Sequence, residues 1–184
     1  VSEAIVIEEL SRVDPSLGVM VAVHVGLCSM TIALSGSEEQ KKKYLPKLAT
    51  GEYLGAYSLS EAGSGTDAAA MVAKAREEDD FYVLNGEKMW VTNGTTAELF
   101  VLFAKVTDHP DYGKKNHGGV TCFIVEKSFE GFKIGKKEDK LGIRSSDTCT
   151  LILEDCKVPK ENVLGEVGKG FPIAMNALDN SRIG

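Results

Sequence analysis

Residues 1–52 carry a helical pattern of apolar and polar positions. Near the start, apolar residues recur among charged ones and form one partly apolar face, at Ile5, Ile7, Leu10 and Val13. The segment Asp14-Pro15-Ser16 predicts a break and a new helix start, because proline is tolerated in a first helical turn. Ser37 and Gln40 have the spacing of a capping box, which predicts another helix start. We expect Pro46 and Gly51 to end this helical region.

Residues 17–34 form an uncharged and mostly apolar stretch. Its length is close to that of a membrane span, which needs ~18 residues or more. The stretch also contains His24 and several small or hydroxyl residues, and no belt of basic residues flanks it. These features favour a core helix over an integral membrane segment.

The pattern changes at Tyr53 to short apolar and alternating runs. Residues 54–60 predict a strand, and residues 81–91 predict a hairpin around Asn85-Gly86, a pair that suits a tight turn. Further strands are predicted at 99–106, 119–126, 132–135 and 149–153. No helical pattern separates these strands, which favours an antiparallel barrel or sandwich over a parallel sheet. A helix is predicted again over residues 171–178, following two glycines.

The composition is that of an ordinary globular protein, with 43% hydrophobic and 26% charged residues. A net charge of −6 argues against binding to nucleic-acid phosphates. None of the four cysteines forms a C-x-x-C pair or lies in a histidine cluster, which argues against a metal site or a disulfide framework. They are Cys28, Cys122, Cys149 and Cys156.

Two segments carry the candidate chemistry. Residues 57–67 lead from a strand into a loop of glycine and hydroxyl residues, which leaves backbone N–H groups free to face an anion. Residues 88–93 contain Trp90, the only tryptophan, followed closely by Thr92. A large flat ring beside a hydroxyl donor suits a planar heteroaromatic cofactor.

Residues 63–68 also fit the loose dinucleotide pattern G-x-G-x-x-A. The element predicted next is a β-hairpin, not the helix and parallel strand of a βαβ unit, so a Rossmann site is disfavoured. Glu61 and Asp67 place carboxylates where a pyrophosphate would lie. They could instead stiffen the loop by accepting its N–H groups.

Several longer motifs occur together in this sequence. Leu59–Ala70 resembles the first signature of the acyl-CoA dehydrogenases, and Asn85–Asn93 resembles the block that follows it. Residues 136–144, 154–160 and 162–165 resemble the rest of the middle domain of that family, in the same order. Ser58 is a departure, because the family usually has Gly, Ala or Cys there.

The resemblance implies an α+β fold, in which an antiparallel β-barrel or sandwich is flanked by helical segments. It also implies a flavoprotein that uses FAD to oxidise acyl-CoA thioesters to trans-2-enoyl-CoA. The expected domains are the end of an N-terminal helical domain at 1–52, a β middle domain that binds FAD and acyl-CoA at 53–165, and the first helix of a C-terminal helical domain at 166–184. The chain is therefore expected to be a central fragment, and we expect it to bind FAD weakly and to be inactive by itself.

The resemblance also assigns cofactor contacts. The backbone of residues 57–60 is expected along the pyrimidine edge of the flavin, and Trp90 against the isoalloxazine ring. Without the neighbouring motif, the residues alone would favour a core tryptophan for Trp90, and an ordinary turn is the alternative for the loop. The implied cofactor-binding residues are Tyr57, Ser58, Leu59, Ser60, Gly65, Thr66, Trp90, Val91 and Thr92.

Substrate contacts are implied for Thr66, Asp179 and Arg182. The last two lie three residues apart on a predicted helix, so a simple ion pair is the alternative. Proton removal next to the thioester needs a carboxylate base. In the isovaleryl branch of the family that glutamate falls at the position of Ser181, which cannot serve, so the base is expected beyond Gly184.

Residues 136–144 and 182–184 most resemble short-chain, butyryl-type members. The resemblance implies acyl-CoA as substrate, an electron-transferring flavoprotein as acceptor, and a homo-oligomer, expected to be a tetramer. The expected location is the cytoplasm for a bacterial or archaeal source and the mitochondrial matrix for a eukaryotic one. The alternatives are an acyl-CoA oxidase, a non-catalytic FAD- or CoA-binding module, and a β-domain without a ligand.

Overall fold

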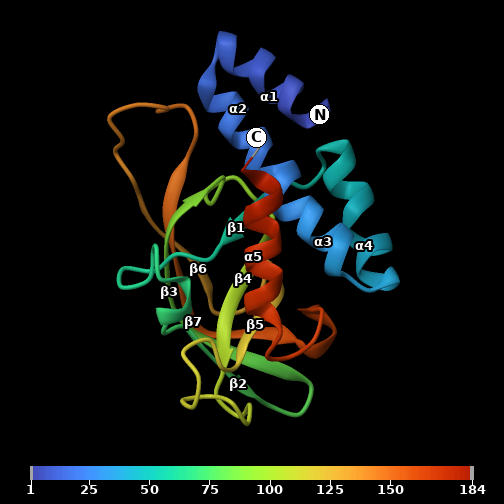
Figure 1. Cartoon of the computed structure of the whole chain (residues 1–184), viewed down its shortest axis with the longest axis vertical. Coiled ribbons are helices and arrows are strands. Elements are labelled where there is room, and N and C mark those ends of the chain that lie inside the picture. Colours follow the sequence, from blue (N-terminus) through green and yellow to red (C-terminus); the bar gives the residue numbers. More distant parts are fainter. Residues whose placement is uncertain (1, 183–184) are drawn as a thin grey trace.

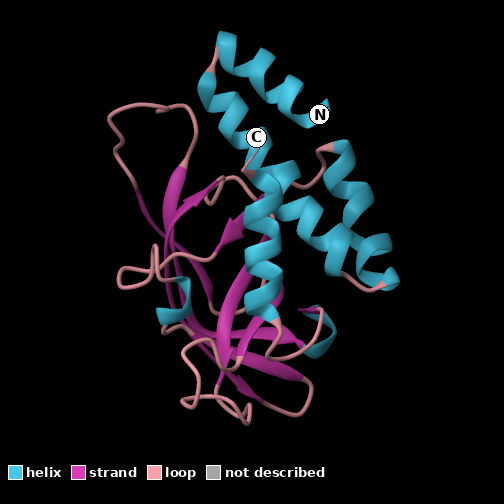
Figure 2. Ribbon diagram, in the orientation of Figure 1, coloured by secondary structure: helices cyan, strands magenta, loops and turns pink. Residues whose placement is uncertain are grey.

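A computed structural model describes residues 2–182 of the chain. Helices form one end of the molecule and strands the other, and the last helix runs across the front of both (Figure 1). The α+β class expected from the sequence is confirmed, with helices clearly segregated from the sheet (Figure 2). The helices are α1 (Ser2–Val13), α2 (Pro15–Val21), the π-helix η1 (Ala22–Ser29), α3 (Met30–Ser35), α4 (Glu38–Thr50) and α5 (Gly170–Ser181).

The helix boundaries follow local chemistry. Asp14 caps α2 by accepting the N–H of Ser16 at 2.8 Å, which confirms the predicted break. Ser37 and Gln40 form the predicted capping box at the start of α4. The prediction that Pro46 ends the helical region is wrong, because it lies inside α4. The helix continues to Gly51, whose φ of 76° ends it.

The helical run 15–35 consists of α2, η1 and α3. Among residues 2–182, it is the one helix long and apolar enough to cross a membrane by length and composition, with a mean hydropathy of 2.1. One side of it packs in the core through Cys28 and Ile32, against strand and α5 residues. The other side exposes Leu17, Val25 and Leu34. The run therefore has the contacts of a core helix on one side only.

Eight strands form a single sheet in the order β6-β7-β3-β2-β4-β5-β8, and β1 pairs with β4. Tyr82 of β3 meets Phe123 of β5 at 5.4 Å between ring centroids, although these strands are not neighbours, so the sheet curls around its own core. The strands are β1 (Gly55–Ser58), β2 (Lys74–Glu77), β3 (Phe81–Thr92), β4 (Leu99–Val106), β5 (Val120–Glu126), β6 (Phe132–Lys137), β7 (Thr148–Pro159) and β8 (Val163–Leu164).

The prediction of a hairpin around Asn85-Gly86 is wrong. These residues form a bulge inside β3, which continues to Thr92 and pairs with β7. Gly86 has a φ of 145°, and a Cβ there would lie 2.9 Å from the Cα of Ala73, so the close approach of another strand requires glycine. Asn85 is fixed by hydrogen bonds with Asp155 on β7, at 2.9 and 3.0 Å. The actual hairpin joins β2 to β3, and the sequence analysis did not detect β2.

The sheet is also not purely antiparallel. β1 runs parallel to β4, and β2 pairs with β4 in parallel over two residues. These pairings are possible because the chain makes a long excursion through β2 and β3 before it returns as β4. As a result, the end of β1 and the end of β3 lie close together, under η1 and α5.

Candidate cofactor and substrate site

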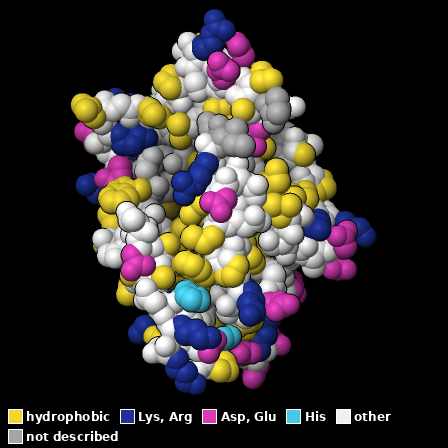
Figure 3. All heavy atoms as spheres, in the orientation of Figure 1, with side chains coloured by type: hydrophobic (Ala, Val, Ile, Leu, Met, Phe, Trp, Pro, Cys, Tyr) yellow, Lys and Arg dark blue, Asp and Glu magenta, His cyan; other side chains and the backbone are white. Residues whose placement is uncertain are grey.

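A pocket of about 600 Å³ lies where the sheet meets the helices. Its walls come from η1, the segment after β1, the end of β3 and the inner face of α5. The face of the molecule that carries α5 shows hydrophobic side chains among charged ones (Figure 3). The residues that line the pocket are Val23, Leu27, Tyr57, Leu59, Ser60, Gly65, Thr66, Asp67, Ala68, Ala69, Met89, Trp90, Thr92, Phe171, Met175, Leu178 and Arg182.

The pocket collects most of the residues singled out from the sequence. Three of them do not line it. Ser58 and Val91 are buried in the protein interior, and Asp179 is exposed beside the pocket. The predicted site residues that do line the pocket are Tyr57, Leu59, Ser60, Gly65, Thr66, Trp90, Thr92 and Arg182.

Trp90 lies at a distortion of β3. The register of β3 against β7 shifts between Lys88 and Val91, and Trp90 has a φ of 57°. A bulky residue in this region is uncommon, and such strain clusters at functional sites. The ring is 58% exposed, so the alternative of a core tryptophan is wrong. The distortion directs a large aromatic side chain to the pocket instead of into the core.

The loop after β1 offers polar groups without partners. Among the described residues, the side-chain hydroxyls of Ser60 and Thr66 make no hydrogen bond, nor does that of Thr92 on the other wall. The N–H groups of Ser60, Gly65 and Thr66 likewise have no backbone partner in that part of the chain. A Cβ built on Gly65 would meet nothing within 4 Å. The wall is therefore open and supplies hydrogen-bond donors to a ligand.

Glu61 and Lys88 form a buried ion pair behind this loop, at 2.7 Å and with 4% and 0% of their side chains exposed. Glu61 also accepts the N–H groups of Val72, at 2.6 Å, and Ala73, at 3.1 Å. Glu61 therefore accepts N–H groups just after the loop, in line with the alternative role given to it, whereas the Asp67 carboxylate accepts none among the described residues. Burial lowers the pKa of Lys88, and the Glu61 carboxylate opposes that shift. Lys88 was missed in the sequence analysis.

Tyr57 and His24 tie the pocket walls together. The buried Tyr57 hydroxyl donates to the carbonyl of Ala174 in α5 at 3.5 Å, and burial raises the pKa of the phenol. His24 of η1 accepts the N–H of Gly55 through Nδ1 at 3.0 Å, so its other nitrogen, Nε2, donates to the carbonyl of Leu48 at 3.1 Å. The π-helical turn that holds His24 also directs Val23 and Leu27 to the pocket.

Asp179 and Arg182 form the ion pair that was considered as the alternative, at 3.6 Å between Oδ1 and Nε. Both side chains are more than three-quarters exposed. An exposed pair of this kind contributes only ~0.3–0.5 kcal/mol. Arg182 nevertheless lines the pocket, so its guanidinium remains available to an anionic group.

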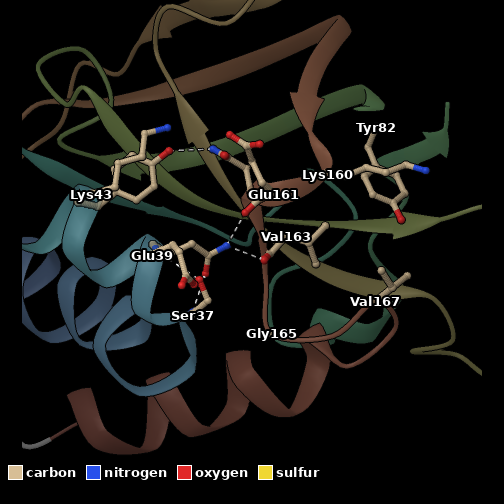
Figure 4. A pocket seen from close by; sticks show the side chains of 12 residues that line it. Ser37, Glu39, Lys43, Tyr82, Lys160, Glu161, Val163, Gly165 and Val167 are labelled. Carbon is tan, nitrogen blue, oxygen red and sulfur yellow. Dashed lines mark hydrogen bonds between the residues drawn. The ribbon is translucent and has the colours of Figure 1, made fainter. Parts of the chain in front are cut away.

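A larger cavity, of about 730 Å³, lies between α4, β3 and the segment that leads into β8 (Figure 4). Three of its polar side chains, those of Gln40, Tyr44 and Asn162, already have hydrogen-bond partners. Gln40 donates to the carbonyls of Glu161 and Val163, and Asn162 donates to the Tyr44 hydroxyl. These bonds fasten α4 to the sheet, which explains the polar residues without a ligand.

The fold and the pocket define an α+β domain with a pocket where the sheet meets the helices, lined by an exposed tryptophan, hydroxyl groups and an arginine. Comparison with known proteins gives its family. The profile of "Acyl-CoA dehydrogenase, middle domain" matches residues 56–156, and that of "Acyl-CoA dehydrogenase, N-terminal domain" matches residues 1–52. The chain belongs to the acyl-CoA dehydrogenase family.

Individual relatives agree with this assignment. The chain is 51% identical to a short-chain-specific acyl-CoA dehydrogenase of Clostridium acetobutylicum, over 100% of the chain and 47% of the relative. It is similar to the butyryl-CoA dehydrogenase structure from Megasphaera elsdenii, with a TM-score of 0.92, 44% identity, and coverage of 97% of this chain and 46% of that one. An acyl-CoA dehydrogenase of Bacillus anthracis complexed with FAD matches with a TM-score of 0.89, 47% identity, and coverage of 97% and 30%. The chain spans about half the length of the curated relative it matches.

Proposed function

We propose that the protein carrying this chain is an FAD-dependent acyl-CoA dehydrogenase that converts acyl-CoA thioesters to trans-2-enoyl-CoA. One observation carries the proposal. The two sequence segments expected to bind the flavin, together with Arg182, form the walls of a single pocket. The match to the acyl-CoA dehydrogenase family over residues 1–52 and 56–156 supplies the class of reaction.

The residues present fit FAD. The hydroxyls of Ser60, Thr66 and Thr92 make no hydrogen bond within the described residues and are free to donate, and an isoalloxazine ring offers acceptors along its polar edge. The open space beside Gly65 leaves room for a diphosphate next to free N–H groups. Trp90 provides an exposed aromatic face. When bound, FAD supplies the acceptor for the hydride of the substrate.

The chain's own groups have separate roles in this proposal. Ser60 and Thr92 hold the ring by hydrogen bonds from opposite walls, and donors there stabilise negative charge on it. Trp90 covers the ring and excludes water. Tyr57, Val91, Leu59 and Ser58 define the position of the strand ends, while Gly65 and Thr66 receive the phosphates. In this assignment, no side chain within residues 57–92 moves a proton.

Substrate binding is assigned to Thr66, Asp179 and Arg182. The guanidinium of Arg182 suits a phosphate or carbonyl group of acyl-CoA. The similarity to short-chain and butyryl relatives supports a short acyl chain. Across residues 2–182, Asp67 is the one carboxylate that lines the pocket, and it is exposed to solvent, whereas a carboxylate base of this kind works in a dry pocket. Ser181 cannot accept the proton, so we place the base outside this chain.

The rest of the proposal concerns the whole protein. We assign residues 1–52, 53–165 and 166–184 to three successive domains, a tetramer as the assembly, and an electron-transferring flavoprotein as the electron acceptor. The location is the cytoplasm in a bacterium or archaeon and the mitochondrial matrix in a eukaryote. A chain of residues 1–184 alone is expected to hold FAD weakly and to be inactive.

The test is anaerobic mixing of the full-length FAD-loaded protein with butyryl-CoA. We expect the flavin absorption to bleach and crotonyl-CoA to form in equal amount. Flavin that stays oxidised, with no enoyl product, would indicate a binding module without turnover. Oxygen consumption without an electron-transferring flavoprotein would indicate an acyl-CoA oxidase.

A further inference from the structure

Lys88 is a charged residue in a place where an apolar one would pack. Its side chain lies on β3 with 0% exposure. Its ammonium donates to the Leu59 carbonyl at 3.0 Å and to Glu61 Oε1 at 2.7 Å. Buried ion pairs of this kind are often no more stabilising than well-packed apolar residues. Stability alone therefore does not account for the pair.

The bond from Lys88 to the Leu59 carbonyl ends on the loop wall of the pocket, and the bond to Glu61 ends on the residue that follows this wall segment. Glu61 closes the loop by accepting the N–H groups of Val72 and Ala73. Next to Lys88, the N–H of Met89 donates to the Ser60 carbonyl at 2.9 Å. The carbonyls of Leu59 and Ser60 are thus both held by β3, just before Trp90. The two walls of the pocket are fixed to each other at these two peptide units.

The Leu59 carbonyl and the Ser60 N–H belong to the same peptide unit. An ammonium that donates to the oxygen withdraws electron density from the whole unit, and hydrogen bonds in series strengthen one another. The N–H of Ser60 becomes a stronger donor as a result. Ser60 lines the pocket, and its N–H has no backbone partner among the described residues.

We propose that Lys88 is a positioning residue that orients and polarises the Leu59–Ser60 peptide, so that the Ser60 N–H stabilises negative charge on the bound flavin when it is reduced. This inference rests on the proposed function, because it takes FAD as the ligand. Glu61 has the complementary role of keeping the ammonium in place and closing the loop. Neither residue contacts the substrate.

The experiment uses the full-length FAD-loaded protein, titrated anaerobically with dithionite against a reference dye. The variants are Lys88→Met and the paired Glu61→Gln/Lys88→Met, which leaves no uncompensated buried charge if the single variant fails to fold. Lys160→Met is the matched control, since it removes an ion pair of the same 2.7 Å length, with Glu77, away from the pocket. FAD content and thermal stability are measured on the same samples.

We expect both Lys88 variants to bind reduced FAD more weakly relative to oxidised FAD by about tenfold, which lowers the potential by about 30 mV for a two-electron couple. Lys160→Met keeps the wild-type potential. A paired variant that holds FAD at the wild-type potential would overturn the inference and leave the proposed function intact. A wild-type protein that retains no FAD would overturn both.

Discussion

Ser58 has a fully buried hydroxyl that makes no hydrogen bond within the described residues. Leaving such a group unpaired costs free energy. We expect Ser58→Ala to raise the free energy of unfolding by about 1 kcal/mol and to keep FAD affinity, because this side chain does not line the pocket. Urea unfolding and FAD titration of the full-length protein check both statements.

Thr121→Val is the matched comparison for Ser58. The Thr121 hydroxyl is equally buried, but it donates to the Gly119 carbonyl and accepts the N–H of Gly168. Its removal should lower the free energy of unfolding by about 1–2 kcal/mol. If Ser58→Ala destabilised the protein as much as Thr121→Val, the hydroxyl of Ser58 would have a partner after all.

Gly65 and Gly63 allow a second matched test. A Cβ on either glycine would meet nothing within 4 Å, but Gly65 lines the pocket and Gly63 does not. Gly65→Leu should therefore weaken FAD binding by about tenfold or more without loss of thermal stability. Gly63→Leu should change neither property. Equal FAD affinity in the two variants would remove Gly65 from the site.

Some residue-scale features have no signature in the sequence. Hydroxyl and glycine residues in a loop, and a lone tryptophan before a threonine, predicted the kind of ligand. The family resemblance predicted the individual residues, of which Ser58, Val91 and Asp179 do not line the pocket. The positive φ of Trp90 and the burial of Lys88 were not predictable. The positive φ lies at the register shift between β3 and β7, where the pairing residues are about 60 positions further along the chain. The burial of Lys88 depends on its distant partners Leu59 and Glu61.

At the scale of elements, the turn between β3 and β4 depends on one carboxylate. Asp147, at the start of β7, accepts the N–H of Thr95 at 2.6 Å and the hydroxyls of Thr95 and Thr96 at 2.5 and 3.0 Å. Burial opposes ionisation of Asp147, but these hydrogen bonds outweigh it and lower its pKa below 3.8. The turn begins at Asn93, directly after the pocket residue Thr92.

We expect Asp147→Asn to lower the free energy of unfolding by about 2 kcal/mol at neutral pH. Because the folded-state pKa is depressed, this contribution is complete above the unfolded-state value and is lost as pH falls through the folded-state value. The difference between wild type and variant should stay constant from pH 7 to about pH 5 and shrink below about pH 4. Thermal melts of both proteins across this pH range check the prediction. A stability difference between wild type and variant that already shrinks above pH 5 would contradict it.

Helices and strands were predictable where the residues that determine them are close together in the sequence. The capping box starts α4 at the predicted residue, and β4 has the predicted limits, because its first six residues are apolar and buried on both sides. Asn85-Gly86 has the local chemistry of a turn, but pairing with β7 along the whole of β3 overrides it. β2 has only Ala75 buried in four residues, which leaves no alternation to detect.

At the scale of the whole molecule, the site exists only where three parts meet. η1 supplies Val23 and Leu27, the loop after β1 and the end of β3 supply the two polar walls, and α5 with the residue after it supplies Phe171, Met175 and Arg182. The resemblance of motifs in order predicted the family, which the profile matches confirm. The meeting of these parts depends on parallel pairing of β1 with β4, which the sequence pattern argued against.

The central claim is that the loop after β1 and the end of β3 are two walls of one flavin site. The most direct measurement follows tryptophan fluorescence while the full-length apoprotein is titrated with FAD, in the wild type and in Trp90→Phe. We predict a quenching component in the wild type that saturates at one FAD per chain and is missing in Trp90→Phe, whose thermal stability stays close to wild type because Trp90 is 58% exposed. Identical quenching in both proteins, or none in either, would contradict the claim.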